Sequence, residues 1–405
     1  ALGTNTTGAN NVAIGVNAML LNTTGSNNVA VGEFALDANT TGGRTTAIGY
    51  RSLSSQTTGS ENVAVGSYAL DYNTTGTQNT AVGESALGAN TTAGNNTAVG
   101  HDALKSTTTG QYNTAVGSLA LDANTTGTQN TSVGYNALST NTTGDYNTAI
   151  GLGALRDNDS SNNNTAVGTE ALKLNTGAKN TAVGAFALDT NTTAEHNVAV
   201  GYAAMDANTT GHSNVAVGAF ALDANTTANQ NTAIGYNALT SLSSGNSCTA
   251  VGTEALENCT TGSDNTAVGQ KALEANTTGG YNTAMGRECM IANTTGQYNT
   301  AVGGLALDAN TTADGNTAIG YNAMSVNTTG TQNVALGTNA LDANTTGSDL
   351  TAIGYEALTN STTSGSNTAL GHRTLQKNTT GSSNSAGGRE ALRENTTGQR
   401  NTAFG

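Results

Sequence analysis

The motif with the clearest chemical potential is Asn-Thr-Thr, which recurs along the whole chain. Each copy matches the acceptor pattern for N-linked glycosylation. The same residues also suit a structural ladder, in which stacked Asn amides and Thr hydroxyls bond to backbone groups and to one another. Stacked strands lie about 4.8 Å apart and sugars on every copy would crowd, so a ladder alone and a ladder with some glycosylation both stay open. The candidate asparagines are Asn5, Asn22, Asn39, Asn73, Asn90, Asn124, Asn141, Asn191, Asn208, Asn225, Asn276, Asn293, Asn310, Asn327, Asn344, Asn378 and Asn395.

Acidic and aromatic side chains also recur at fixed places. A row of Asp could bind calcium, but the Gly-Gly-x-Gly-x-Asp pattern of calcium-binding rolls is absent, so we interpret the row as a solvated acidic edge. The Tyr residues could contact sugars or neighbouring fibres, and packing along an exposed edge explains them as well. The acidic row comprises Asp37, Asp71, Asp122, Asp189, Asp206, Asp223, Asp308 and Asp342. The Tyr residues are Tyr50, Tyr112, Tyr135, Tyr146, Tyr202, Tyr236, Tyr281, Tyr298, Tyr321 and Tyr355.

Nothing in the sequence supports catalysis. The four His residues stand singly without ligand spacing, and neither a nucleophile with its base nor a phosphate-binding loop is present. The three cysteines, Cys248, Cys259 and Cys289, are too few for a disulfide framework. Because they fall at three different places in the repeat, we expect no bridge within the chain. The sequence thus predicts a protein that is not an enzyme and that has no cofactor and no metal site.

The composition excludes several other classes of protein. Charged residues make up 10% of the chain, and there is no Pro and no Trp, whereas ordinary domains are roughly 25% charged. A net charge of −14 with scattered Lys and Arg residues argues against a nucleic-acid partner. No apolar run is long enough to span a membrane. A thin core that is used many times would explain this composition.

A 17-residue repeat organises the whole chain. With the glycine of Asn-Thr-Ala-Val-Gly as position 0, the 24 anchors run from Gly15 to Gly168 and from Gly184 to Gly405 in steps of 17, with one interval of 16 between these two series. Position −2 is Ala in 23 copies, positions −3 and −1 are mostly β-branched, and position +4 is Leu or Met. Asn occupies position −4 in 21 copies, and the Asn of Asn-Thr-Thr stands at +7. This alternation predicts a strand and excludes helical repeats.

Charge placement outlines the expected coil. Of the 40 charged residues, 39 lie at positions +1, +2, +5, +6, −6 and −5, and charged side chains are rarely buried. We therefore expect each repeat to form one coil, with a strand through −4 to 0, a corner, a second short strand through +3 to +6, and an Asn-Thr-Thr-Gly corner. The predicted fold is all-β: a rod-shaped parallel β-solenoid, of the β-roll or β-helix type, with about 24 coils of 17 residues. It forms one repetitive domain over residues 1–405.

The predicted core is thin and consists of the side chains at −3, −1 and +4. Because side chains alternate along a strand, Ala at −2 would then point to the opposite face. A column held at Ala indicates close packing, either against a second subunit, most simply around a threefold axis, or against the second strand of the same coil. The candidate interface column includes Ala13, Ala30, Ala47, Ala64, Ala81, Ala98 and Ala115.

The segment Asn62–Leu70 reads Asn-Val-Ala-Val-Gly-Ser-Tyr-Ala-Leu. It resembles the head repeat of trimeric autotransporter adhesins and haemagglutinin-type surface proteins, whose core is Val-Ala-Ile-Gly-x-x-Ala. The resemblance covers essentially the whole chain, with little information in each repeat. It implies a left-handed parallel β-roll, three chains per fibre, display on a cell surface, and binding to host matrix or other cells. The present repeat departs from that family in its greater length and its additional Asn-Thr-Thr-Gly corner.

These observations favour a structural or adhesive fibre or filament subunit outside the cell, at a cell surface. Its expected partners are further copies of itself, in a trimer or an end-to-end polymer, and a host surface, matrix or glycan. The alternatives are a receptor-binding shaft of the phage tail-fibre type and, less favoured because its paired Thr residues lie at a corner, an ice-binding solenoid. Since the chain begins and ends within the repeat, we expect either flanking sequence in a longer fibre or end-to-end stacking.

Overall fold

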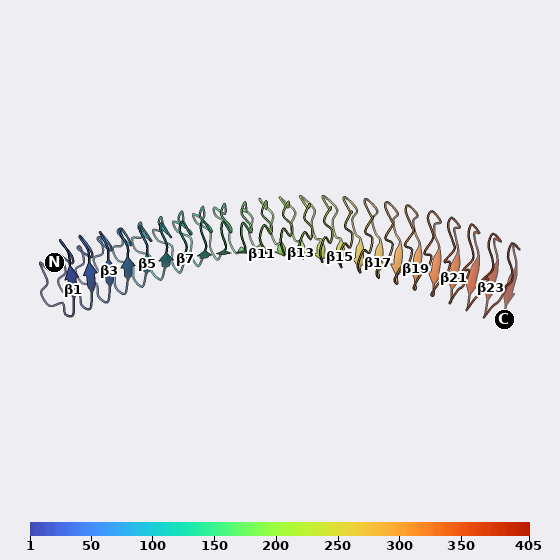
Figure 1. The fold of residues 1–405 in the computed structure, drawn as a ribbon, viewed down its shortest axis with the longest axis horizontal. Coiled ribbons are helices and arrows are strands. Elements are labelled where there is room, and N and C mark those ends of the chain that lie inside the picture. Colours follow the sequence, from blue (N-terminus) through green and yellow to red (C-terminus); the bar gives the residue numbers. More distant parts are fainter. The chain divides into compact units, whose positions relative to one another are not determined.

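The computed structural model describes residues 1–405, which divide into an N-terminal unit, Ala1–Ala199, and a C-terminal unit, Val200–Gly405. In each unit one repeat forms one coil of a β-solenoid, and each coil contributes one three-residue strand (Figure 1). This confirms the predicted fold class and its 17-residue period. The structure contains no helix with the length and apolar character needed to cross a membrane.

The strands occupy the same three positions, −3 to −1, in every repeat, and so are shorter than the predicted −4 to 0. The N-terminal unit contains β1 (Val12–Ile14), β2 (Val29–Val31), β3 (Thr46–Ile48), β4 (Val63–Val65), β5 (Thr80–Val82), β6 (Thr97–Val99), β7 (Thr114–Val116), β8 (Thr131–Val133), β9 (Thr148–Ile150), β10 (Thr165–Val167) and β11 (Thr181–Val183). The boundary between the units falls within β12 (Val198–Val200). The C-terminal unit contains β13 (Val215–Val217), β14 (Thr232–Ile234), β15 (Thr249–Val251), β16 (Thr266–Val268), β17 (Thr283–Met285), β18 (Thr300–Val302), β19 (Thr317–Ile319), β20 (Val334–Leu336), β21 (Thr351–Ile353), β22 (Thr368–Leu370), β23 (Ser385–Gly387) and β24 (Thr402–Phe404).

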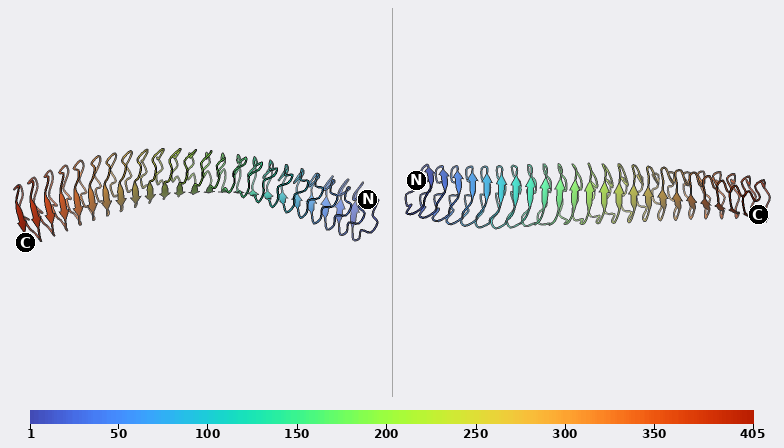
Figure 2. Two further views of the ribbon diagram at one scale, coloured as in Figure 1. Left: turned by 180° about the vertical axis from the view of Figure 1, so that it is seen from behind. Right: turned by 90° about the horizontal axis from the view of Figure 1, so that it is seen from below.

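Successive strands within each unit are parallel and in register. The pairing of β6 with β7 places Thr97 beside Thr114 and Ala98 beside Ala115. Like residues therefore stack above one another, and the strands of each unit line one face of the coils (Figure 2). The one 16-residue interval keeps this register, since Thr165 still pairs with Thr181. The deletion is absorbed at the Asn-Thr-Thr corner, where it does not invert the faces of a strand.

The prediction of a second strand at +3 to +6 is wrong, because positions +1 to +6 form a turn. The residues at +2 and +4 have positive φ, as at Asn136 (54°) and Leu138 (52°), and an extended strand requires negative φ. The turn still stacks on its neighbours, because Leu138 donates its N–H to the carbonyl of Ala154 at 2.9 Å in the next coil.

The prediction that the side chains at −3 and −1 point into the core, with Ala at −2 on the opposite face, is also wrong. Ala at −2 points into the coil and is buried, whereas −3 and −1 face outward, as the pattern of β9 shows, with Ala149 buried between half-buried Thr148 and exposed Ile150. The interior also holds Ala at +3, Leu at +4 and the two Asn columns. Alternation along a strand shows that the side chain at −2 points to the opposite face from those at −3 and −1. It does not show which of the two faces points into the coil. The two walls of a coil face each other across a narrow interior, and Ala supplies the small side chain that fits there.

Position 0 requires glycine for two reasons. At Gly269 the φ angle is +136°, a conformation that side chains rarely allow. A Cβ atom at this position would also lie 2.4 Å from the carbonyl oxygen of Gly286 in the next coil. The glycine column therefore permits both the bend after each strand and the close stacking of the coils.

Candidate interaction surface

The side chains at −3 and −1 form what we call the outer strand face. Val and Ile at −1 keep more than a third of their surface exposed in many coils, as at Val116 (37%) and Ile150 (39%). The neighbouring column at −3 is Thr in 17 copies, Val in six and Ser in one. No charged residue stands at −4 to 0 anywhere in the chain. Each unit thus presents a continuous uncharged strip of methyl and hydroxyl groups.

The Asn column at +7 forms a buried ladder. Asn39 donates from Nδ2 to Oδ1 of Asn22 in the preceding coil at 2.7 Å and to the carbonyl of Gly42 at 3.0 Å. The following Thr forms a second row, in which the Oγ1 of Thr40 donates to the carbonyl of Thr57 at 3.0 Å. Fifteen of the 17 candidate glycosylation residues have no exposed surface, and Asn5 and Asn395 are less buried. A sugar on Nδ2 would take a hydrogen that the ladder uses.

The Asn column at −4 forms a second, parallel ladder. The Oδ1 of Asn62 accepts the backbone N–H of Asn79 at 2.9 Å, and Asn79 donates from Nδ2 to the carbonyl of Ala93 at 2.8 Å. The same carbonyl accepts Nδ2 of Asn90, from the +7 column, at 3.1 Å. The two ladders therefore meet at one backbone oxygen per coil, and they satisfy buried polar groups that would otherwise be costly.

The Ala column does not lie on a surface. From Ala30 to Ala115 the candidate interface residues have no exposed area within the chain, and only Ala13, in the first coil, is less buried. This placement corresponds to the alternative interpretation, in which Ala packs against the opposite wall of its own coil. A second subunit would meet the neighbouring columns at −3 and −1 instead.

The acidic row at +5 lies along a partly buried edge. Burial raises the pKa of Asp37, Asp122, Asp223 and Asp308, because desolvation disfavours the carboxylate. One carboxyl oxygen of Asp37, Asp122 and Asp308 has no hydrogen-bond partner. Asp71 instead contacts Arg51, with Nε 3.4 Å from Oδ1.

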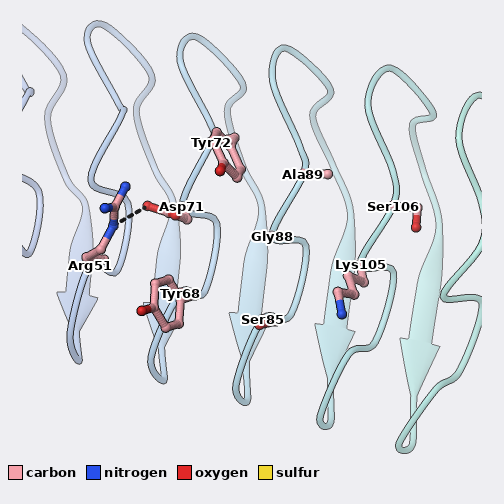
Figure 3. A pocket seen from close by; sticks show the side chains of 9 residues that line it. All are labelled: Arg51, Tyr68, Asp71, Tyr72, Ser85, Gly88, Ala89, Lys105 and Ser106. Carbon is pink, nitrogen blue, oxygen red and sulfur yellow. Dashed lines mark hydrogen bonds and ion pairs between the residues drawn. The ribbon is translucent and has the colours of Figure 1, made fainter.

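That contact borders a hollow in the N-terminal unit (Figure 3). The hollow has a volume of about 440 Å³ and is lined by Arg51, Asp71 and Lys105 together with Tyr68 and Tyr72. Its two aromatic rings, Tyr68 at position +2 and Tyr72 at position +6, belong to one coil, and both are exposed. It brings together no pair of groups suited to general acid and base chemistry beyond the ion pair itself.

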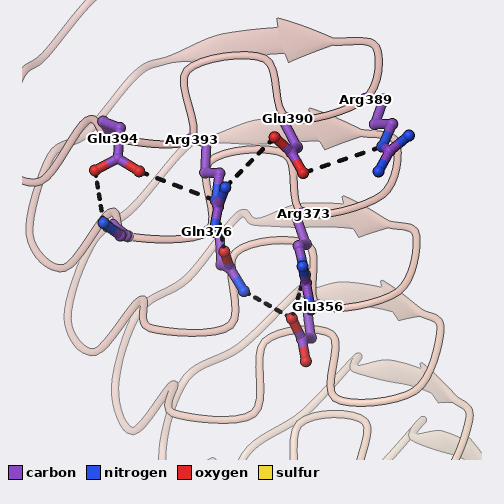
Figure 4. A network of polar contacts seen from close by, with 8 residues as sticks. Glu356, Arg373, Gln376, Arg389, Glu390, Arg393 and Glu394 are labelled. Carbon is purple, nitrogen blue, oxygen red and sulfur yellow. Dashed lines mark hydrogen bonds and ion pairs between the residues drawn. The ribbon is translucent and has the colours of Figure 1, made fainter.

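Charged side chains in the last coils form a network that joins neighbouring coils (Figure 4). Glu356 accepts from Arg373 Nε at 2.8 Å and from Gln376 Nε2 at 2.7 Å. Arg393 donates to Gln376 at 3.1 Å and lies 3.4 Å from Glu390. These exposed and half-exposed pairs contribute little individually, and their placement at the edge agrees with the predicted charge outline.

Three carboxylates, Glu254, Glu257 and Glu274, come within 4.8 Å of one another. The ammonium group of Lys271 lies 3.0 Å from Glu254 and 3.1 Å from Glu274. One cation of the chain itself thus pairs with two of the three carboxylates and offsets one unit of their negative charge. This explains the cluster as part of the solvated edge.

Aromatic rings at exposed corners on either side of the strand contact one another along the stack. Tyr281 and Tyr298, in adjacent coils, are stacked with ring centroids 5.1 Å apart, and Tyr50 and Tyr68 meet edge to face at 5.4 Å. Packing along the edge therefore accounts for much of the Tyr pattern.

Two cysteines that stand at different positions of the repeat lie close together in the structure. Cys248 stands in the −4 column and Cys259 in the +7 column of the same coil, and both sulfur atoms contact the carbonyl oxygen of Gly262, at 3.3 Å and 3.5 Å. All three cysteines are free thiols in the structure, but the different columns do not keep this pair apart, because the −4 and +7 columns converge across the coil. One sequence feature could have predicted this proximity: the two cysteines stand at −4 and +7, the positions that the paired Asn residues occupy in other coils.

No family model matches the chain, and no curated protein matches its sequence.

Proposed function

We propose that this protein is a non-catalytic structural fibre subunit that associates with further copies of itself through the outer strand face. The observation that carries the proposal is the uncharged strip of exposed and half-buried Val, Ile and Thr side chains that recurs on most coils. Long exposed apolar surfaces on soluble proteins usually mark interaction sites. The strands of this strip are parallel and in register, so the same set of side chains repeats along each unit.

The size of the strip suits a stable contact. The eleven strands of the N-terminal unit, β1 to β11, are each three residues wide, so that strip measures roughly 50 Å by 10 Å, or about 500 Å² in projection. A standard protein interface buries roughly 800 Å² of accessible surface per partner. A strip of one unit, with its side-chain relief, is therefore of the right order for one half of an interface.

A second copy of the chain is the occupant that fits best. Two such strips have the same spacing between coils, so rows of methyl groups from one copy can lie between rows from the other over the whole length. The strip itself carries no charge, because all charged residues stand outside positions −4 to 0. The resemblance to trimeric head repeats favours three copies.

The test places charge on this face in two coils of the N-terminal unit. We expect the wild-type chain to form oligomers in sedimentation velocity and light scattering, and the double variant Val82→Lys with Val116→Lys to shift towards monomer. Both side chains are more than a third exposed, so the folded coil can accommodate them. The control is Thr92→Lys with Thr126→Lys, which places the same charges on exposed corners of the same two coils.

The outcomes separate clearly if circular dichroism shows that all variants keep their β structure. A control that dissociates as strongly as the face variant would show that net charge, and not this face, governs association. A monomeric wild-type chain at high concentration would refute self-association through any face.

We place the fibre outside the cell, at a cell surface, where it would contact host matrix or other cells. This follows from the resemblance to adhesin head repeats and from the repetitive, weakly charged composition. Antibody labelling of intact source cells tests the location, and electron microscopy separates long filaments from the short tipped rods of a tail fibre.

We propose that the Asn-Thr-Thr column carries no sugar on folded coils, so the intact mass should equal that of the bare polypeptide.

A second candidate function is ice binding, and one observation now favours it. The paired Thr residues lie at a corner, but the structure also shows Thr at −3 facing outward beside Val or Ile at −1 on regularly stacked strands, as in β9. Regular hydroxyl and methyl groups on a flat face can order water. Thermal hysteresis by a monomeric wild-type chain, abolished by Val82→Lys with Val116→Lys, would support this function instead of the fibre.

A further inference from the structure

The two Asn ladders cross the interior of every regular coil at one point. In the coil anchored at Gly83, Asn79 and Asn90 both donate to the carbonyl of Ala93, at 2.8 Å and 3.1 Å. These residues belong to opposite walls, since the chain passes through the strand and the turn between them. The side chains at −4 and +7 of one coil are therefore neighbours across the core.

The coil anchored at Gly252, in the C-terminal unit, carries cysteine at both of these positions. The sulfur atoms of Cys248 and Cys259 lie 3.3 Å and 3.5 Å from the same carbonyl oxygen, that of Gly262. Both side chains are completely buried. Their mutual side-chain interaction lowers the pKa of Cys248 and raises that of Cys259.

We propose that Cys248 and Cys259 form a disulfide that clasps the two walls of this coil when the chain meets a low-molecular-weight disulfide such as oxidised glutathione. In regular coils the two Asn side chains at −4 and +7 are linked through hydrogen bonds to one shared carbonyl. In this coil a covalent bond between the two sulfur atoms would take the place of that link. The chain between the two cysteines, residues 249–258, forms the strand and the turn of the coil. The bond therefore closes the coil into a ring and restricts the unfolded chain.

The exchange balances in two steps. The thiolate of one cysteine attacks a sulfur of oxidised glutathione, so that a mixed disulfide forms and one glutathione thiolate leaves. The thiolate of the second cysteine then attacks the protein sulfur of the mixed disulfide and releases a second glutathione. Two protein thiols are oxidised, the glutathione disulfide is reduced to two thiols, and the two protons pass to the leaving thiolates. Because both sulfurs are buried in the closed coil, exchange takes place before the coil closes or while it is open.

The third cysteine supplies an internal control. Cys289 stands in the +3 column, where its sulfur contacts the carbonyls of Ala301 at 3.3 Å and Ala306 at 3.5 Å. Burial raises its pKa to about 12, and its sulfur contacts carbonyls other than the Gly262 oxygen that Cys248 and Cys259 share. It should stay free while the other two pair.

The test uses the full chain, unfolded with reductant and refolded in a mixture of oxidised and reduced glutathione. After an acid quench, the thiols are alkylated under denaturing conditions and counted by intact mass. We expect one alkylated thiol after oxidative refolding and three after refolding with reductant. A Glu-specific protease then cuts after Glu254 and Glu257, which lie between the two cysteines. The two fragments should stay joined until they are reduced.

Two matched variants complete the test. Cys248→Asn and Cys259→Asn each restore the residue that most coils have at that position, so both should fold, as circular dichroism would verify. Each should show two alkylated thiols and no joined fragments. The proposal is overturned if the refolded wild-type chain keeps three alkylated thiols, carries glutathione on either cysteine in place of the bridge, or joins Cys289 to one of the other two.

Discussion

Removing one rung of the +7 ladder tests whether the Asn-Thr-Thr corner is structural. Asn293 takes part in three hydrogen bonds: Nδ2 donates to Asn276 Oδ1 at 2.9 Å and to the Gly296 carbonyl at 3.1 Å, and Oδ1 accepts from Asn310 at 2.8 Å. In Asn293→Ala the Gly296 carbonyl keeps a donor, because Asn282 also binds it at 2.8 Å. The Oδ1 of Asn276 loses its only side-chain donor and stays buried.

The expected cost follows from these contacts. A buried polar atom without a partner costs about 1–3 kcal/mol, and each lost hydrogen bond contributes about 1 kcal/mol. We therefore expect Asn293→Ala to destabilise its coil by roughly 3 kcal/mol. A difference of about 1.4 kcal/mol is tenfold in an equilibrium, so backbone amides around Asn293 should exchange roughly 100-fold faster with deuterium when local opening controls the exchange.

The control variant separates the ladder from glycosylation. Thr295→Ala destroys the Asn-x-Thr pattern at Asn293, but Thr295 is exposed and its side chain is not part of the ladder. We expect near wild-type exchange in this variant, in a host that glycosylates and in one that does not. Equal acceleration in Thr295→Ala and Asn293→Ala, or unchanged exchange in Asn293→Ala, would refute the structural role of the Asn side chain.

Three further predictions concern the core, the glycine column and the acidic edge. Leu138→Ala removes a fully buried side chain and should cost about 2–5 kcal/mol, measured as faster exchange in its coil. Gly269→Ala places a Cβ atom 2.4 Å from the Gly286 carbonyl, so we expect loss of about 3 kcal/mol or more, seen as proteolysis at this coil. Burial raises the pKa of Asp308, so its contribution to stability is most favourable below about pH 4 and is lost as pH rises through the raised pKa. Asp308→Asn should therefore slow local exchange at pH 7 but not at pH 3, whereas the exposed Asp349→Asn should change neither.

The period-2 pattern and the charge outline predicted the main features of the coil. The strand position, the parallel register and the edge all follow from columns of like residues, because in-register stacking brings each residue above its counterpart. The tolerance of the missing Thr after Asn175 was also predictable, since a corner can shorten without changing a strand's faces. The turn at +1 to +6 was not predictable in this way, because Leu at positive φ is rare and propensity favours a strand there.

The sequence by itself determined the repeat, the strand, the glycine column and the places where charge is allowed. These depend on period and on local sterics, which repeat unchanged from coil to coil. The tertiary structure alone decided which strand face lies inside, and so moved Ala30 to Ala115 from a candidate interface to the core. It also decided that the −4 and +7 columns meet at one carbonyl, which brings Cys248 beside Cys259. The reason is physical: alternation is symmetric between the two faces, and only the path of the turn fixes which walls face each other.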